Sequence, residues 1–436
     1  MSSSNRSSCI GVAGAGNSGV PHAAMISKAG LHAYLYADKK HRKSNFNDLL
    51  LQSYKDGNLP FADAFINTAG EVIGTYNVTL VFSIQRMVNM CGEIWNNMPE
   101  FAHDQFVAEL EECDNLGDVL IGTVTANGFS SKARNRIHPR GFMDLAVSPM
   151  ASRSTLGNAF IAGVKKGMYC GLFPCDLPVS VMDNYRKVFS EQTLRGLPNG
   201  FSALFANTNL WVHPGPLLLG LVAAEMNAPG LKFYPDCFGG RFGSRVAANL
   251  AKAINALAQK YQAPNLPVGV DLSQFYYDFH ASDIPDFAKR LPAYNAQSFM
   301  PNVETMEKSR YLIEDPAVLG TLATLAKLAD MSPRPFYAVV DMVGMAINDD
   351  YINDTCELPE DDLSALDMKG LSFSEIIGAI NETKDEWDQR WEGGLEAERI
   401  NRVKAASGPN FHEFIAARLA DPAMKPVWDE FVHSQF

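Results

Sequence analysis

A glycine-rich motif near the start of the chain constrains the fold more than any other feature of the sequence. Residues 14–19 read Gly-Ala-Gly-Asn-Ser-Gly, a complete GxGxxG pattern. An apolar run at 9–13 precedes the motif, and an apolar segment at 20–29, predicted to be a helix, follows it. The first glycine permits a tight turn, the second lets the backbone approach a pyrophosphate, and the third lets helix and strand pack closely. The pattern therefore predicts a strand–turn–helix unit that binds a dinucleotide.

An acidic residue lies where such a unit recognises the adenosine ribose. The second predicted strand, 31–37, is followed at once by Asp38. A carboxylate there accepts hydrogen bonds from the ribose hydroxyls and repels a 2′-phosphate, which favours NAD. The basic run 39–43 comes next and could instead hold the phosphate of NADP. We expect NAD, with NADP as the alternative, bound by Gly14, Ala15, Gly16, Asn17, Ser18, Gly19 and Asp38.

Strands and helices alternate over the first part of the chain. The predicted strands are 77–82, 93–98, 118–124 and 165–174, and the predicted helices between them are 84–90 and 101–110. This alternation predicts an α/β Rossmann domain, a doubly wound parallel sheet with helices on both faces. Helical periodicity then dominates, at 216–226, 244–261, 315–328, 335–346, 372–381, 395–406 and 410–419.

Three regions follow from this change of pattern. We expect a Rossmann domain at 1–199, an all-α catalytic domain at 200–365 and a helical C-terminal extension at 366–436. Ligands of open α/β sheets bind beyond the carboxyl ends of the strands. The active site is therefore expected in the cleft between the first two regions.

Composition argues against several classes of partner. The net charge of −12 argues against a nucleic-acid surface, which needs clustered Lys and Arg. No stretch approaches the roughly 20 apolar residues of a membrane span, and the polar, Ser-rich start leaves no room for a signal peptide. The 7 cysteines are scattered without a CxxC pair, which predicts reduced thiols and no zinc site. We expect a soluble, cytoplasmic monomer or homodimer without a metal, acting on small molecules.

Five short strings, in the same order, resemble the octopine/nopaline dehydrogenase family. They are the glycine motif, NMPEFAH at 97–103, SPMASR at 148–153 with GVKK at 163–166, WVHPGP at 211–216, and RYLIED at 310–315 with LAKLA at 325–329. The tail beyond about residue 365 has no counterpart in this resemblance.

The resemblance implies an enzyme that condenses a 2-oxo acid, typically pyruvate, with an amino acid and reduces the imine with NAD(P)H. The residues that match the catalytic pair of the family are His213 and Asp315. An imidazole can donate and accept a proton near neutral pH, and a carboxylate on its other nitrogen stabilises the imidazolium. By themselves, the residues also fit a core histidine at 213 and, ahead of Pro316, a helix N-cap at 315.

Two further segments are expected to contact ligands. Arg310 could hold a substrate carboxylate with two hydrogen bonds, or could pair at the surface with Glu307 or Glu314. Pro99 and His103 follow a predicted strand at the edge where cofactors bind. We expect them to shape the nicotinamide side of the site from a loop.

Departures from the family pattern bear on the substrate. Octopine-type enzymes carry a carboxylate, for the guanidinium of arginine, where this chain has Ala146. They carry an aromatic hydroxyl where it has Asn209, and a pyruvate-contacting Gln near Ala126 and Asn127. We expect Asn127 and Asn209 to bind substrate, and a small amine donor such as alanine, glycine or taurine rather than arginine.

Two other readings of the sequence stay open. Dehydrogenases of the 2-hydroxy-acid or glycerol-3-phosphate type usually place a Lys on the first helix of their second domain, and this chain has none between His213 and Asn227. A non-catalytic dinucleotide-binding protein is the second alternative, and an intact pair of His213 and Asp315 argues against it.

The cofactor preference gives a direct test of Asp38. We expect wild type to prefer NADH to NADPH, and Asp38→Ala to narrow that preference because the repulsion of the 2′-phosphate is lost. Dissociation constants for the two cofactors, measured by fluorescence titration, check this. A wild-type preference for NADPH would show that the basic run 39–43 decides the choice.

Overall fold

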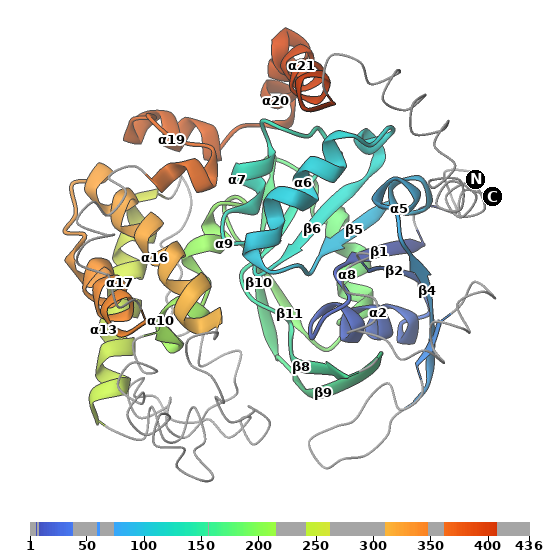
Figure 1. Ribbon diagram of the computed structural model, residues 1–436, viewed down its shortest axis with the longest axis horizontal. Coiled ribbons are helices and arrows are strands. Elements are labelled where there is room, and N and C mark those ends of the chain that lie inside the picture. Colours follow the sequence, from blue (N-terminus) through green and yellow to red (C-terminus); the bar gives the residue numbers. More distant parts are fainter. Residues whose placement is uncertain are drawn as a thin grey trace, which may run out of the picture.

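The computed structural model describes residue 6 and residues 8–37, 59–61, 74–155, 157–214, 241–261, 310–347 and 362–407. Within these ranges, nine strands form one sheet (Figure 1). The strands are β1 (Cys9–Ala13), β2 (His32–Tyr36), β3 (Leu59–Phe61), β4 (Tyr76–Val81), β5 (Glu93–Asn96), β6 (Leu120–Val124), β7 (Gly141–Leu145), β10 (Gly167–Phe173) and β11 (Thr193–Gly196).

The central six strands have the doubly wound arrangement that the alternating pattern predicts. Their order is β4-β2-β1-β5-β6-β7, and all neighbouring pairs among them are parallel. At the edges, β3 joins β4 and β10 joins β7 antiparallel, and β11 runs parallel to β10. The predicted fold class, a Rossmann sheet followed by helices, is confirmed. The order reverses at β1, and the GxGxxG turn leaves the sheet at that point.

Helices cover both faces of this sheet. One face carries α2 (Gly19–Lys28), α8 (Asp183–Val188) and a hairpin of β8 (Met150–Thr155) and β9 (Asn158–Val164). The other carries α5 (Ile84–Met90), α6 (His103–Glu111) and α7 (Phe129–Ala133). Successive residues of a strand point to opposite faces, so Ile10 and Val12 join one buried cluster while Cys9 and Ala13 join the other. Burial on both faces explains why β1 is continuously apolar.

A helical part lies beside the sheet (Figure 1). Its described helices are α9 (Ser202–Phe205), α10 (Asn209–Val212), α13 (Arg241–Tyr261), α16 (Arg310–Leu328) and α17 (Arg334–Ile347). Leu250, Ile254 and Leu257 form a buried stripe on α13, as the helical periodicity predicts. This stripe belongs to the same apolar cluster as the α2 face of the sheet, so the core continues from one part into the other.

The C-terminal segment contacts both parts. It consists of η6 (Asp362–Leu366), α19 (Phe373–Ile380), α20 (Lys384–Arg390), η7 (Trp391–Leu395) and α21 (Glu396–Ser407). The Phe373 ring packs on Tyr261 of α13, with centroids 5.0 Å apart. Farther along, the Trp387 and Trp391 indoles donate hydrogen bonds of 3.0 and 3.3 Å to the Arg134 carbonyl, just after α7. In Figure 1, α20 and α21 accordingly lie against the sheet domain and not the helical part.

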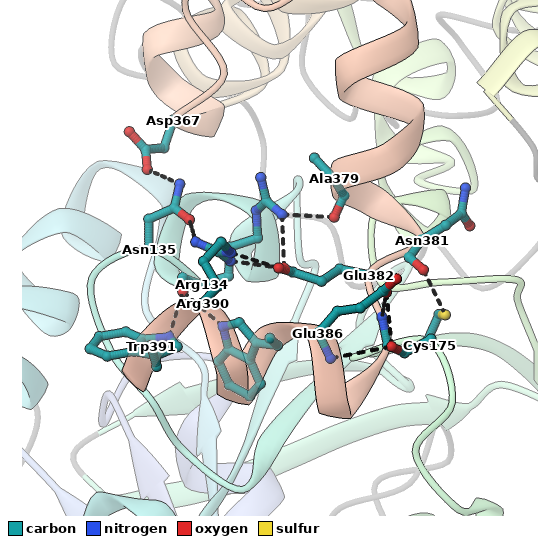
Figure 2. Close-up of polar contacts among 12 residues, drawn as sticks. Arg134, Asn135, Cys175, Asp367, Ala379, Asn381, Glu382, Glu386, Arg390 and Trp391 are labelled. Carbon is teal, nitrogen blue, oxygen red and sulfur yellow. Dashed lines mark hydrogen bonds and ion pairs between the residues drawn. The ribbon is translucent and has the colours of Figure 1, made fainter. Parts of the chain in front are cut away.

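The chain passes between the two parts at two neighbouring places. Asn199, between β11 and α9, donates from Nδ2 to Oδ1 of Asn381, between α19 and α20, at 2.9 Å. Beside this contact, Glu382 forms ion pairs with both Arg134 and Arg390, at 3.2 and 2.6 Å (Figure 2). The Arg134 guanidinium also donates to the Ala379 carbonyl at 2.7 Å. The two connections are therefore bonded to each other and to the end of α7.

Several elements differ from the sequence predictions. The strand β7 was not predicted, because Asp144 interrupts its apolar run, and neither was the hairpin of β8 and β9. The predicted helix 315–328 begins five residues earlier, at Arg310. The predicted helices 216–226 and 410–419 lie outside the described residues. Within the described ranges, no helix is long and apolar enough to cross a membrane.

Candidate active site

The glycine motif forms a tight turn between β1 and α2. Gly14 has φ +102°, which side-chain-bearing residues rarely adopt, and its N–H donates to the Tyr36 carbonyl at 3.2 Å. A Cβ on Gly19 would lie 1.7 Å from the Gly14 carbonyl oxygen, so only glycine lets α2 start this close to the turn. A Cβ on Gly16 would have nothing within 4 Å. The turn thus leaves open space at Gly16, where a pyrophosphate fits against the start of α2.

Side chains of the motif hold the turn in place. The Asn17 side-chain oxygen accepts from the Ser154 N–H at 3.0 Å, and its carbonyl accepts from the Ser152 hydroxyl at 2.9 Å. The Ser18 hydroxyl donates to Asn97 Oδ1 at 2.7 Å. Asn17 and Ser18 are therefore held by the hairpin of β8 and β9 and by the residue after β5. The groups of the turn that remain to bind a dinucleotide phosphate are its main-chain N–H groups.

Two buried histidines lie close to this turn. His22, which the sequence analysis did not single out, bonds from Nδ1 to the same Asn97 oxygen, and burial lowers its pKa to about 4. His103 is the first residue of α6, inside the predicted helix 101–110, so the expectation that it acts from a loop is wrong: β5 ends at Asn96 and helical turns begin at Glu100. Its Nε2 bonds to the Met98 carbonyl at 3.3 Å, and burial lowers its pKa to about 4. Both rings are neutral near pH 7.

Pro99 immediately precedes the turn η2 (Glu100–Ala102), which leads into α6. Its φ of −65° and extended ψ direct the chain away from β5 and into that turn. Pro99 therefore lies at the carboxyl end of β5, beside Asn97, on the same sheet edge as the glycine motif. Asp38, the residue expected to bind the ribose, lies outside the described residues.

The turn that follows β6 reaches the helical part. Thr125, Asn127 and Gly128 have φ values of +62°, +46° and +79°. Asn127 donates from Nδ2 to Glu100 Oε2 at 2.9 Å and accepts at Oδ1 from Asn207 at 2.7 Å. The amide of Asn127, expected to bind substrate, is thus engaged in two protein hydrogen bonds.

Asn207 is fully buried and continues these contacts into α10. Its Oδ1 accepts from the Asn209 N–H at 2.9 Å, and the Asn209 carbonyl accepts from the His213 N–H at 3.1 Å. Asn209, the first residue of α10, therefore lies one turn before His213, which follows the last residue of that helix. Asn207 was not predicted as a site residue, although the Asn-Thr-Asn run before an apolar segment is a helix-start signal.

His213 and Asp315 form a hydrogen-bonded pair. Asp315 Oδ2 lies 2.8 Å from His213 Nδ1, and the two side chains are only 4% and 9% exposed. The helix α16 starts at Arg310, so both Asp315 and Pro316 lie inside it. Asp315 is therefore not the N-cap that its position ahead of Pro316 suggested. The side chain of Arg310 lies outside the described residues.

This pair has the geometry of an acid–base unit. A carboxylate that accepts from Nδ1–H fixes one tautomer of the ring and directs proton exchange to Nε2. With little water nearby, the carboxylate also stabilises the imidazolium that forms when Nε2 takes up a proton. The arrangement can therefore donate a proton to an oxygen or nitrogen of a bound substrate and later recover it.

Comparison with family models finds a match over this part of the chain. Residues 197–347 match the model of the alpha-helical domain of NAD/NADP octopine/nopaline dehydrogenases. The match includes Asn207, Asn209, His213 and Asp315. A comparison with curated proteins finds no significant match.

Solved structures share the fold at low sequence identity. A structure of octopine dehydrogenase with NADH and L-arginine has a TM-score of 0.56 and 15% identity, covering 78% of this chain and 89% of its own. Yersinopine dehydrogenase with NADP+ bound has a TM-score of 0.59 and 14% identity, covering 88% and 99%. A 2-dehydropantoate 2-reductase from Geobacter metallireducens GS-15 has 0.52 and 12%, covering 78% and 99%. Likeness at this identity establishes the fold.

The neutral His103 predicts a pH dependence of stability. Its folded pKa of about 4 lies below the ordinary value of 6.5, so the unfolded chain takes up a proton first as pH falls. The stabilisation is complete above about pH 6.5 and declines towards pH 4. His103→Gln keeps a donor for the Met98 carbonyl. The decrease in the free energy of unfolding from pH 7 to pH 5 should be smaller for His103→Gln than for wild type. The difference between the two decreases should be on the order of 2 kcal/mol.

Urea titrations at the two pH values measure this difference. The comparison with wild type is needed because His22 contributes in the same direction, whereas burial raises the pKa of Asp144 to about 7 and contributes in the opposite one. If the free energy of unfolding decreases equally for wild type and His103→Gln, then His103 takes up a proton in the folded protein at pH 5.

Proposed function

We propose that this chain, a member of the octopine/nopaline dehydrogenase family through its helical domain, joins a 2-oxo acid to the amino group of an amino acid by NAD(P)H-dependent reduction. The family consists of NAD(P)-dependent oxidoreductases that act on CH–NH bonds. The observation that carries the proposal is the buried pair of His213 and Asp315, within the matched region.

The proposed roles follow from the proton balance of the reaction. The amine adds to the carbonyl carbon, and the resulting carbinolamine loses water only when its oxygen takes up a proton. We assign that proton to Nε2 of His213, with Asp315 stabilising the charged ring through Nδ1. When bound, NAD(P)H supplies the hydride that reduces the imine carbon. His213 is neutral once it has given its proton to the departing water, and it can take up the proton that the ammonium group of an incoming amine loses before its nitrogen attacks.

The cofactor is assigned to the sheet domain. The main chain of 14–19 fits the pyrophosphate, and Asp38 would favour NAD by accepting from the ribose hydroxyls. Pro99 and His103 would shape the nicotinamide side without exchanging protons, because the His103 ring is neutral and packed on Phe129 with centroids 5.2 Å apart. Arg310 would hold a substrate carboxylate.

A small amine donor is the favoured substrate. Ala146 is fully buried and provides no carboxylate for a guanidinium. The nearby carboxylate of Asp144 is also fully buried and accepts from the Ser130 N–H at 3.1 Å. Asn209 lacks the aromatic hydroxyl of octopine-type enzymes. These positions favour alanine, glycine or taurine over arginine. Pyruvate is proposed as the oxo acid because the family typically uses it.

A matrix of 2-oxo acids against amines, followed by NADH absorbance, tests this choice. We expect NADH oxidation only when both substrates are present, and a kcat/KM for arginine at least tenfold below that for the best small amine, since a charged group left unpaired costs affinity. Oxidation with an oxo acid alone would identify a 2-hydroxy-acid type of dehydrogenase. Efficient turnover of arginine would contradict the interpretation of Ala146 and Asn209.

The acid–base pair is tested by removing each member. His213→Ala should lower kcat by about a hundredfold to ten-thousandfold, since no positioned imidazole remains, while NADH binding stays near wild type. Asp315→Asn should also act mainly on kcat. The double variant should cost little more than His213→Ala, because residues that act as one unit are not additive.

A matched control is the second histidine–aspartate pair, in which His138 Nε2 lies 2.8 Å from Asp388. This pair lies between the sheet domain and α20, so His138→Gln should leave kcat within about twofold of wild type. Additive losses for His213→Ala and Asp315→Asn would mean that Asp315 has only a structural role. Near-normal kcat for His213→Ala would exclude the proposed mechanism.

A further inference from the structure

We infer that Asn127 and Asn207 are positioning residues, which set the place of His213 from the edge of the sheet. This inference rests on the proposed function, since it concerns the same histidine. Four hydrogen bonds form a continuous path across the boundary between the sheet and the helical part. The path runs from Glu100 through Asn127 and Asn207 to the first residue of α10, and from there to His213.

Each step of the path joins a specific donor to a specific acceptor. Asn127 donates to Glu100 at 2.9 Å, and Asn207 donates to Asn127 at 2.7 Å. The Asn209 N–H donates to Asn207 Oδ1 at 2.9 Å, and the His213 N–H to the Asn209 carbonyl at 3.1 Å. The next contact beyond the path is the 2.8 Å bond between the His213 ring and Asp315.

Only an amide satisfies both central positions. Asn127 and Asn207 each donate through Nδ2 and accept through Oδ1. A carboxylate would lack the donor and an aliphatic side chain would lack both groups. Asn207 is 0% exposed, so a partner lost there is not replaced by bulk water. The path therefore fixes where α10 begins, and α10 is a helix of 4 residues that ends immediately before His213.

The turn that carries Asn127 is itself strained. Thr125 is β-branched and has φ +62°, which is an outlier for such a residue, and Asn127 also has a positive φ. Strain of this kind persists only where surrounding contacts impose it, and it gathers at functional sites. Here the contacts are with the helical part and η6: a Cβ on Gly128 would lie 2.4 Å from Leu366 Cδ2.

A positioning role and a substrate contact predict different kinetics. A substrate contact at Asn127 would raise KM for the oxo acid in Asn127 variants and leave Asn207 variants unaffected. A positioning path predicts lower kcat in both, because a catalytic group displaced by about 1 Å can lose about a hundredfold in rate. It also predicts that the two losses are not additive, since either substitution breaks the same path.

The first experiment compares Asn127→Ala, Asn207→Ala and the double variant. We expect each single variant to lower kcat at least tenfold, with the NADH dissociation constant and the oxo-acid KM within about threefold of wild type. The double variant should match the slower single one. Additive losses, or a change confined to the oxo-acid KM of the Asn127 variant, would overturn the inference.

The second experiment uses pH to rescue the path. Asn127→Asp places two carboxyl groups in contact with each other, and the repulsion between their charges raises the pKa of the pair. At low pH the shared proton restores a donor between them, and as pH rises the pair ionises and separates. The ratio of variant to wild-type kcat should therefore fall as pH rises. A ratio that stays constant with pH would contradict the proposed path.

Asn135→Asp is the matched control. Asn135 donates from Nδ2 to Asp367 Oδ2 at 2.6 Å and accepts at Oδ1 from the Arg390 guanidinium (Figure 2). This variant therefore also creates a pair of carboxylates between the sheet domain and a later segment, and Arg390 favours their charged forms. Asn135 takes no part in the path to His213. Its kcat ratio should stay constant with pH. A fall equal to that of Asn127→Asp would show a general effect of added charge and overturn the inference.

Hydrogen exchange tests the path without any substrate. Amides of a peptide spanning 207–213 should exchange faster in Asn127→Ala and Asn207→Ala than in wild type, while a peptide spanning 374–380 of α19 should not change. This result is expected even if the substrates differ from those proposed, so it separates failure of the path from failure of the function. Unchanged exchange at 207–213 would overturn the inference.

Discussion

His213 Nδ1 and Asp315 Oδ2 lie 2.8 Å apart, and both side chains are almost fully buried. Burial removes the hydration of polar and charged groups, and only a well-placed hydrogen bond compensates for that loss. Both backbones must therefore be held firmly. His213 and Asp315 are 102 residues apart, so packing must bring them together. The apolar faces of α10, α13 and α16 meet in one buried cluster and provide this support. The placement of α10 against the sheet then decides where the imidazole lies relative to a dinucleotide.

Two of the sets of contacts that join the sheet domain to the rest of the chain differ in kind. Near the ends of the connections, Glu382 is shared by Arg134 and Arg390. Burial lowers the pKa of the Arg134 guanidinium to about 10, so it remains charged at neutral pH. Near the site, neutral amides of Asn127 and Asn207 make the contact. Ion pairs thus join the parts near the ends of the connections, whereas a hydrogen bond between two neutral amides joins them near His213.

Local patterns in the sequence predicted the elements that depend on local chemistry. The glycine turn, α2 and α5 follow from apolar periodicity and short-range signals, and α5 has the predicted ends. The strand β7 was missed because buried Asp144 breaks the apolar run, and its partner Ser130 is distant in sequence. The start of α16 was misplaced because proline is typical of the first turn of a helix, whereas Pro316 lies inside α16. The path through Asn127 and Asn207 depends on tertiary contacts, which local patterns do not encode.

The bond between Asn199 and Asn381 has a consequence for how such proteins diversify. Because the chain leaves the sheet domain and returns to it at adjacent points, the intervening segment is an insertion with neighbouring ends. Insertions of this kind can be exchanged or lengthened without disturbing their host. Selection can thus alter the intervening segment while the glycine turn and its supporting hairpin stay unaltered.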